Sequence, residues 1–224
     1  MDRNELLGKL ALCIERGKVN KQANYPPDMQ GEMGASELTE SALQNGVKAG
    51  DILSQALMKG MQKIGDKFGK GQAFIPDLLI AAKAMYAAIE HLRPYFESGE
   101  VEHRGTIILG TVAGDLHDIG KNLVKMVLEG NGWQVIDLGT DVSADKFLAA
   151  LKNNPQGMVG MSALLTTTML NMAPINQAIK KEFPAVKVFV GGAPVSHEFS
   201  NKIGADGYFS SPQALVQHLN LTEN

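Results

Sequence analysis

The residues best suited to chemistry lie together in the segment GTVAGDLHDIGKNL, positions 110–123. It contains a histidine, His117, between two carboxylates, Asp115 and Asp118. One ring nitrogen of a histidine can bind a metal while the other donates to a carboxylate, which fixes the tautomer and raises the basicity of the metal-binding nitrogen. Asp115 is two residues away and can be that carboxylate. The segment is therefore a candidate metal-binding site.

The segment stands at the start of an α/β pattern. After Gly105, short β-branched runs alternate with stretches long enough for helices; the runs are TIILGT, WQVIDLG, GMVGMSAL, VKVFVGG and GYF. This alternation predicts repeated βαβ units and a parallel sheet covered on both faces. Five strands in about 115 residues fit a flavodoxin-like (Rossmann-like), doubly wound sheet with strand order 2-1-3-4-5.

In such a sheet, ligands bind outside the carboxyl ends of the strands, at the switch point between the first and third strands. The loops to consider are therefore those after the first, third and fourth strands. Their glycines allow the backbone to approach a bulky ligand, and their hydroxyls can bond its polar edge or a phosphate. Besides the acid–histidine pair, these loops contain Ser162, Thr166, Thr167, Thr168, Gly191 and Gly192.

Two other interpretations of the histidine segment remain open on spacing alone. Asp115 and Asp118 can simply cap the following helix, with His117 an ordinary loop residue. Alternatively, Asp115, His117 and Asp118 can form a zinc or iron site, although the only other histidine in the switch-point loops is His197.

The part of the chain before the α/β pattern has a helical period. Apolar residues on one face predict helices at 51–69 and 75–96, and two shorter helices are expected near 3–16 and 36–47. No strand pattern occurs among them. The sequence thus predicts a four-helix bundle at 1–96, a polar linker at 97–105 and the α/β domain at 106–224.

Composition excludes several classes of function. The 224 residues carry a net charge of −3 and no dense basic run, which argues against nucleic acid as a partner. No run of about 18 apolar residues and no secretory signal are present, so we expect no membrane association and a cytoplasmic location. Cys13 is the only cysteine, so neither a disulfide framework nor a cysteine-based metal site is available.

Three motifs together resemble those of cobalamin-binding (corrinoid) proteins of methyltransferase systems, including the cobalamin-binding region of methionine synthase. The family's Asp-x-His-x-x-Gly, Ser-x-Leu and Gly-Gly occur here in order. The helical half is also similar, especially the stretch KIGDKFGKGQAFIPDLLIAAKAM. The residues that carry the motifs are Asp115, His117, Asp118, Ile119, Gly120, Ser162, Leu164, Gly191 and Gly192.

The resemblance implies a cofactor and a role for each position. The cofactor would be cobalamin or a related corrinoid, as methylcobalamin or hydroxocobalamin, bound His-on: His117 replaces the displaced lower base as axial ligand of cobalt. Asp115 would orient His117, and Thr168 would extend that hydrogen-bond relay. The remaining positions would bind the displaced nucleotide tail (Ser162, Thr166), admit it without a side-chain clash (Gly120, Gly191, Gly192) or, in the bundle, shield the upper face of the cofactor (Phe74).

The resemblance also implies a function, that of a corrinoid protein that accepts a methyl group on cobalt. A substrate-specific methyltransferase would supply the methyl group, and a second methyltransferase with a tetrahydrofolate- or thiol-type acceptor would remove it, with a reductive activase as a further partner. A catalytic (β/α)₈ barrel alone takes about 250 residues, so we expect a carrier and not a complete enzyme. The alternatives are a cobalamin-dependent sensor or regulator, the small subunit of a cobalamin isomerase, and a flavodoxin-type binder of flavin or phosphate.

Overall fold

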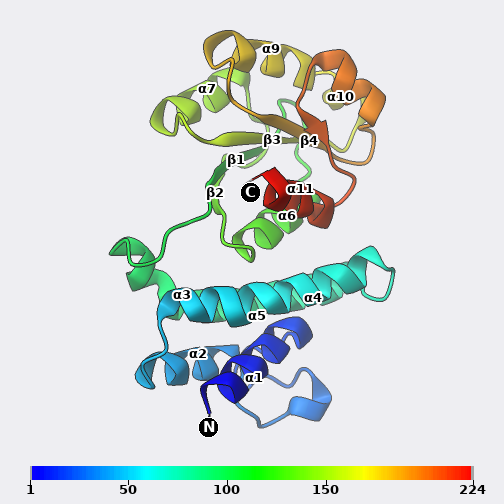
Figure 1. Ribbon diagram of the computed structural model, residues 1–224. Coiled ribbons are helices and arrows are strands. Elements are labelled where there is room, and N and C mark those ends of the chain that lie inside the picture. The colour runs from blue at the N-terminus through cyan, green and yellow to red at the C-terminus, as the bar shows by residue number, and fades with distance from the viewer. Residues whose placement is uncertain (1, 223–224) are drawn as a thin grey trace. The chain divides into compact units, whose positions relative to one another are not determined.

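The computed structural model describes residues 2–222 and divides the chain into two compact units (Figure 1). The first contains the residues up to His103 together with Gly130–Gly132. The second contains Arg104–Glu129 and the residues from Trp133 onward. Residues 98–105, which make up most of the predicted linker, connect the last helix of the first unit to the first strand of the second. No helix within residues 2–222 is long and apolar enough to cross a membrane.

The helical unit contains the four predicted helices. They are α1 (Arg3–Arg16), α2 (Ala35–Gln44), a continuous helix made of α3 (Ala49–Ile52), the π-helical turn η2 (Leu53–Leu57) and α4 (Met58–Gly69), and α5 (Ile75–Glu97). Their inward faces carry fully buried apolar residues such as Leu10, Ile14, Leu57 and Met85. Burial of these faces stabilises the unit, as the helical spacing of the sequence predicts.

The loop between α1 and α2, which includes the short 3₁₀ helix η1 (Pro27–Met29), is held by specific polar contacts. The side chain of Lys18 is fully buried, and its Nζ donates to the carbonyl oxygen of Ala23 at 2.7 Å. Glu37 accepts from the backbone N–H groups of Lys21 and Gly34 at 3.0 and 2.9 Å. These bonds satisfy backbone groups that no helix or strand pairs, and those to Glu37 join the loop to α2.

The second unit is a five-stranded, all-parallel sheet in the order β2-β1-β3-β4-β5, which confirms the predicted topology. The strands are β1 (Thr106–Thr111), β2 (Gln134–Asp137), β3 (Met158–Ser162), β4 (Val188–Gly191) and β5 (Gly207–Tyr208). The helices are α6 (Ile119–Glu129), α7 (Ala144–Asn153), α8 (Thr166–Met169), α9 (Met172–Glu182), α10 (His197–Ile203) and α11 (Pro212–Thr222).

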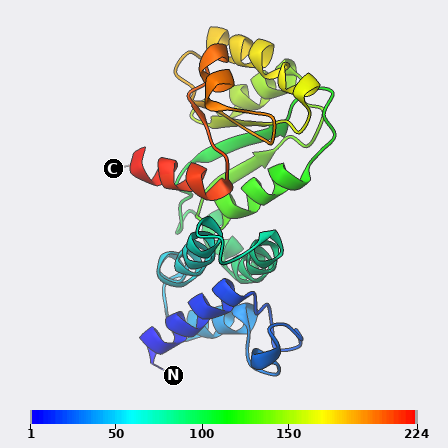
Figure 2. The same ribbon diagram turned by 90° about the vertical axis from the view of Figure 1, so that its right-hand side faces the viewer.

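Helices cover both faces of this sheet. Helices α6 and α11 lie side by side on one face, and α7, α9 and α10 lie on the other (Figure 2). The register aligns the strand ends: Thr111 of β1 pairs with Ser162 of β3, which pairs with Gly191 of β4. The loops that follow these strands therefore leave the sheet at one edge, which is where the candidate residues lie.

Candidate functional site

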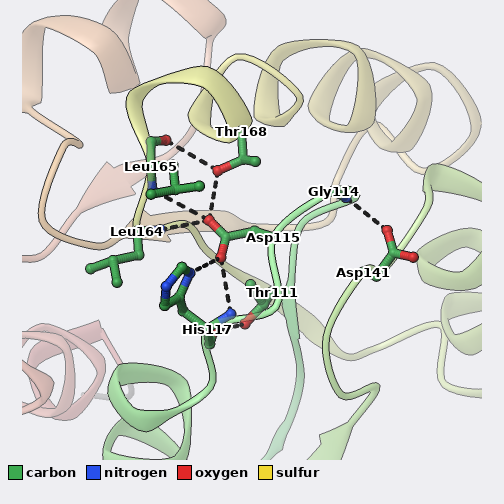
Figure 3. A network of polar contacts seen from close by, with 8 residues as sticks. All are labelled: Thr111, Gly114, Asp115, His117, Asp141, Leu164, Leu165 and Thr168. Atoms are coloured by element: carbon green, nitrogen blue, oxygen red, sulfur yellow. Dashed lines mark hydrogen bonds and ion pairs between the residues drawn. The ribbon is translucent and has the colours of Figure 1, made fainter.

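The loop between β1 and α6 is organised around the carboxylate of Asp115, which is fully buried. Its Oδ1 accepts two hydrogen bonds from His117, one from the ring Nδ1 at 2.8 Å and one from the backbone N–H at 3.0 Å (Figure 3). This double contact closes a tight turn and fixes the orientation of the imidazole ring. The predicted pairing of Asp115 with His117 is present in the structure.

The other oxygen of Asp115 faces the loop after β3. Oδ2 accepts from the hydroxyl of Thr168 at 2.6 Å and from the backbone N–H groups of Leu164 and Leu165 at 2.8 and 3.4 Å (Figure 3). The predicted contact from Thr168 is therefore also present. Leu164 contributes through its backbone N–H, which its place in the Ser-x-Leu motif did not reveal, while its side chain is exposed.

These hydrogen bonds determine the charge of Asp115. Burial alone would raise the pKa of its carboxyl, but the hydrogen bonds from Thr168, Leu164 and His117 favour the ionised form more strongly and hold the pKa well below its usual range. An ionised carboxylate only accepts, so the proton of the neutral His117 ring must be on Nδ1. Nε2 then carries a free lone pair, and within residues 2–222 it has no hydrogen-bond partner.

The His117 ring is at the surface, with 51% of its side chain exposed, so its Nε2 is accessible to a ligand. Exposed apolar side chains also occur on these two loops and at the first residue of α6. These exposed residues are Leu116, Ile119, Leu164 and Leu165. One oriented imidazole nitrogen beside an apolar surface fits a large, mostly apolar cofactor whose metal needs a single protein ligand.

Three further side chains hold the backbone of the His117 loop, and sequence reasoning missed all of them. Thr111 Oγ1 donates to the carbonyl oxygen of His117 at 2.9 Å, and Asn171 Nδ2 donates to that of Ala113 at 2.7 Å. Asp141 Oδ1 accepts from the backbone N–H of Gly114 at 2.7 Å, as Figure 3 shows. No local sequence signal pairs these residues, because they come from three different elements.

Asp141 is also unusual in its backbone. Its φ of 53° makes it the only non-glycine residue with positive φ in the described chain. Its backbone N–H donates to the carbonyl oxygen of Asp115 at 3.0 Å, so Asp141 contacts the His117 loop through both its backbone and its side chain. Aspartate tolerates the left-handed region better than most residues, so this conformation costs less free energy here than it would with most other side chains.

The two alternative interpretations of the histidine segment find no support. Asp115 bonds His117 and the β3 loop and does not cap α6, so the capping interpretation is wrong for that residue. The exposed Asp118 instead bonds Asn122, whose Nδ2 donates to its Oδ2 at 3.0 Å. Within residues 2–222, no group of three or more His, Cys, Asp or Glu side chains is arranged to hold a metal ion.

The glycines of the three motifs differ in how much space a side chain would have at each position. No heavy atom lies within 4 Å of the position that a Cβ would take at Gly120, at the start of α6. Gly192 has a φ of +124°, and a Cβ there would lie 1.9 Å from the carbonyl oxygen of Ala163. The protein's own packing therefore already requires glycine at 192, whereas the sequence motif assigns this glycine to space for a ligand. At Gly191 the nearest atom to a Cβ would be the carbonyl oxygen of Phe209, at 3.2 Å.

The remaining predicted positions lie at the ends of elements that border the expected loops, and not within the loops themselves. Ser162 ends β3 and is half-buried, and the exposed Thr166 begins α8. In the helical unit, Phe74 immediately precedes α5 and is 68% exposed, whereas Leu78 is buried in the bundle core. An exposed phenylalanine at a helix start leaves an apolar ring available for contact.

Comparison with known proteins shows which family has this fold. Two models of the B12 binding domain match the chain. One matches residues 105–216, and the other matches residues 32–93. The chain is 40% identical over 186 residues to trimethylamine corrinoid protein 2 of Methanosarcina mazei. The alignment covers 81% of this chain and 85% of that protein. It is 35% identical over 219 residues to dimethylamine corrinoid protein 1 of Methanosarcina acetivorans, with 96% of each chain covered.

A solved structure gives the same result. The methanol:cobalamin methyltransferase complex MtaBC from Methanosarcina barkeri contains a chain that matches with a TM-score of 0.81 and 28% identity, covering 98% of this chain and 80% of that one. The chain thus belongs to the B12-binding family. Within it, the chain is a corrinoid protein of methyltransferase systems, and its function is that of a methyl carrier.

Proposed function

We propose that this protein binds its corrinoid His-on through Nε2 of His117 and carries a methyl group between two methyltransferases. The cobalt of the bound corrinoid would supply the chemistry, by accepting and releasing the methyl group. The observation that carries the proposal is the contact of the Asp115 carboxylate with Nδ1 of His117 at 2.8 Å. It keeps the Nδ1 proton in place and so leaves Nε2 free as a ligand.

The other residues of the site hold this pair in position. Thr168 and the backbone N–H of Leu164 stabilise the charge of Asp115, which in turn makes the imidazole a better donor to a metal. Taking up a proton at the Asp115–His117 pair would weaken ligation, so the pair can adjust how firmly the axial ligand is held. Gly120 would leave space for the displaced nucleotide tail, and Ser162 and Thr166 would offer hydroxyls to it.

For the methyl donor, we propose a methylamine. The support is the 40% identity to a trimethylamine corrinoid protein and the 35% identity to a dimethylamine corrinoid protein, against 28% for the matched chain of the methanol complex. The donor would be presented by a substrate-specific methyltransferase. The second partner would be a methyltransferase with a tetrahydrofolate or thiol acceptor, and a reductive activase would restore the cobalt after oxidation.

The test of His-on binding uses the purified protein incubated with hydroxocobalamin or with cobinamide, which has no lower base, and then desalted. The nitrogen splitting is compared in the cobinamide samples, where only the protein can supply an axial nitrogen. We expect the wild type to retain corrin absorption and, after reduction to Co(II), to show the splitting of the electron paramagnetic resonance signal by one axial nitrogen. His117→Ala should lose the nitrogen splitting.

His197→Ala is the matched control, because His197 is an exposed histidine at the start of α10, after β4. This variant should behave as the wild type. An unchanged nitrogen splitting in His117→Ala would refute ligation by His117, and absence of retained corrin in the wild type would refute the carrier function itself.

A further inference from the structure

Asp141, in the loop after β2, holds two consecutive residues of the His117 loop. Its Oδ1 accepts from the backbone N–H of Gly114 at 2.7 Å, and its own backbone N–H donates to the carbonyl oxygen of Asp115 at 3.0 Å. Asp141 reaches the loop from the side away from Leu164 (Figure 3). The position of Asp115 is therefore fixed through its side chain on one side and through its backbone on the other.

The backbone conformation of Asp141 indicates that its side chain has a use. Every other residue with positive φ within residues 2–222 is a glycine, which adopts this conformation without strain. The next residue, Val142, forms a parallel bridge with Val112 and donates its N–H to the carbonyl oxygen of Thr111, which brings the chain back to the end of β1. A strained residue persists where its surroundings enforce the conformation, and such residues cluster at functional sites.

The carboxylate of Asp115 needs accurate placement, because it serves two side chains at once. Oδ1 lies 2.8 Å from Nδ1 of His117, and Oδ2 lies 2.6 Å from the hydroxyl of Thr168. Hydrogen bonds weaken steeply when their distance or angle departs from these values, so a shift of the Asp115 backbone would loosen both contacts. The bonds from Asp141 oppose such a shift, since they fix the backbone on both sides of the Asp115 Cα.

We propose that Asp141 is a positioning residue for axial ligation. By fixing the backbone of Asp115 it fixes the carboxylate that orients the imidazole, and so the direction of Nε2 of His117. Side chains that orient a metal-binding histidine affect metal affinity without touching the metal. The inference rests on the proposed function, because it requires His117 to be the axial ligand. It assigns to Asp141 no contact of its own with the corrinoid.

The test measures cobinamide binding by equilibrium dialysis in a double-mutant cycle of Asp141→Gly and His117→Ala. Glycine accepts the positive φ, so Asp141→Gly removes only the side-chain bond. We expect it to weaken cobinamide binding about threefold to tenfold, the effect of one hydrogen bond, and to reduce the nitrogen splitting of the Co(II) form. In the His117→Ala protein the same substitution should change the affinity by less than about twofold, because no ligand is left to position.

Two variants serve as controls. Asp141→Asn keeps an acceptor for the N–H of Gly114 and should bind cobinamide as the wild type does. Asp206→Ala is the matched control, because Asp206 also accepts from a backbone N–H, that of Val188 at 2.8 Å. Val188 is the first residue of β4 and so lies at the end of the strand away from the site. Asp206→Ala should lower the melting temperature and leave cobinamide binding unchanged.

Three results would overturn the inference. Equal weakening by Asp141→Gly with and without His117 would mean that Asp141 contacts the corrinoid or supports the fold in general. Unchanged cobinamide affinity in Asp141→Gly would show that the bond to Gly114 does not position the ligand, while leaving His117 ligation standing. A His117→Ala protein that binds cobinamide as tightly as the wild type, with the same nitrogen splitting, would overturn this inference and His-on binding together.

Discussion

Replacing Asp115 by asparagine would reverse the proton position on His117. The substitution keeps the size of the side chain but turns one acceptor oxygen into a donor. The Oδ2 side faces the N–H of Leu164 and the hydroxyl of Thr168, so the amide oxygen must take that side. The amide nitrogen then faces Nδ1 of His117, which must accept, and the ring proton moves to Nε2. The variant should therefore hold His117 in the tautomer that cannot bind a metal through Nε2.

The structure also gives the size of the effect on stability. The backbone N–H of His117, 3.0 Å from Oδ1, loses its acceptor, which costs about 1–3 kcal/mol. The bonds from Thr168 and Leu164 lose their charge assistance, about 1 kcal/mol more. We expect the free energy of unfolding at pH 7 to fall by about 2–4 kcal/mol in total, the sum of these two effects.

The pH dependence has a definite sign. Because folding lowers the pKa of Asp115, its carboxylate stabilises the wild type at pH values above the unfolded-state pKa of about 4. That stabilisation is lost as the pH falls below about 4, through the window between the unfolded and folded pKa values. The asparagine variant has no such group, so the difference in stability between the two proteins should shrink on acidification.

Two measurements test this reasoning on the cofactor-free protein. Nitrogen-15 NMR of the His117 ring reports which nitrogen carries the proton, and urea unfolding at pH 7 and at stepwise lower pH reports stability. Asp118→Asn is the control, since this exposed carboxylate bonds only Asn122, and its stability should change by less than about 0.5 kcal/mol. A proton still on Nδ1 in Asp115→Asn, or a loss below about 0.5 kcal/mol, would refute the reasoning.

Three further predictions concern the residues around the pair. Thr168→Val removes the hydroxyl 2.6 Å from Oδ2, so carbon-13 NMR should find a higher pKa for Asp115, and urea unfolding a loss of about 1.5–3 kcal/mol that Thr168→Ser restores. Asp141→Ala should cost about 1–3 kcal/mol, because it loses the bond to the N–H of Gly114 and keeps a positive φ, whereas Asp141→Asn should lie within about 1 kcal/mol of the wild type. Gly192→Ala should destabilise by more than about 3 kcal/mol, because its Cβ meets a backbone carbonyl, while Gly120→Ala, in open space, should be near neutral in the same assay.

Local sequence patterns were sufficient to predict the architecture. Helical spacing identified the four bundle helices, and the alternation of strands and helices predicted both the parallel sheet and its order, because these signals depend on neighbours a few residues apart. The contact between Asp115 and His117 was also predictable from the sequence, since the two residues are two positions apart in one loop. The predicted strand order also placed the switch point at the loop that contains the Asp115–His117 pair.

The contacts that hold the site together could not be predicted from local sequence patterns. The bonds from Leu164 and Thr168 to Asp115 span 49 and 53 residues, and those from Asp141 and Asn171 to the His117 loop span 27 and 58. They form because the parallel register aligns the ends of the strands, which no local pattern encodes. Gly192 makes the same point: its sequence motif indicated space for a ligand, whereas its positive φ and the approach of a neighbouring carbonyl exist only once β3 and β4 are paired.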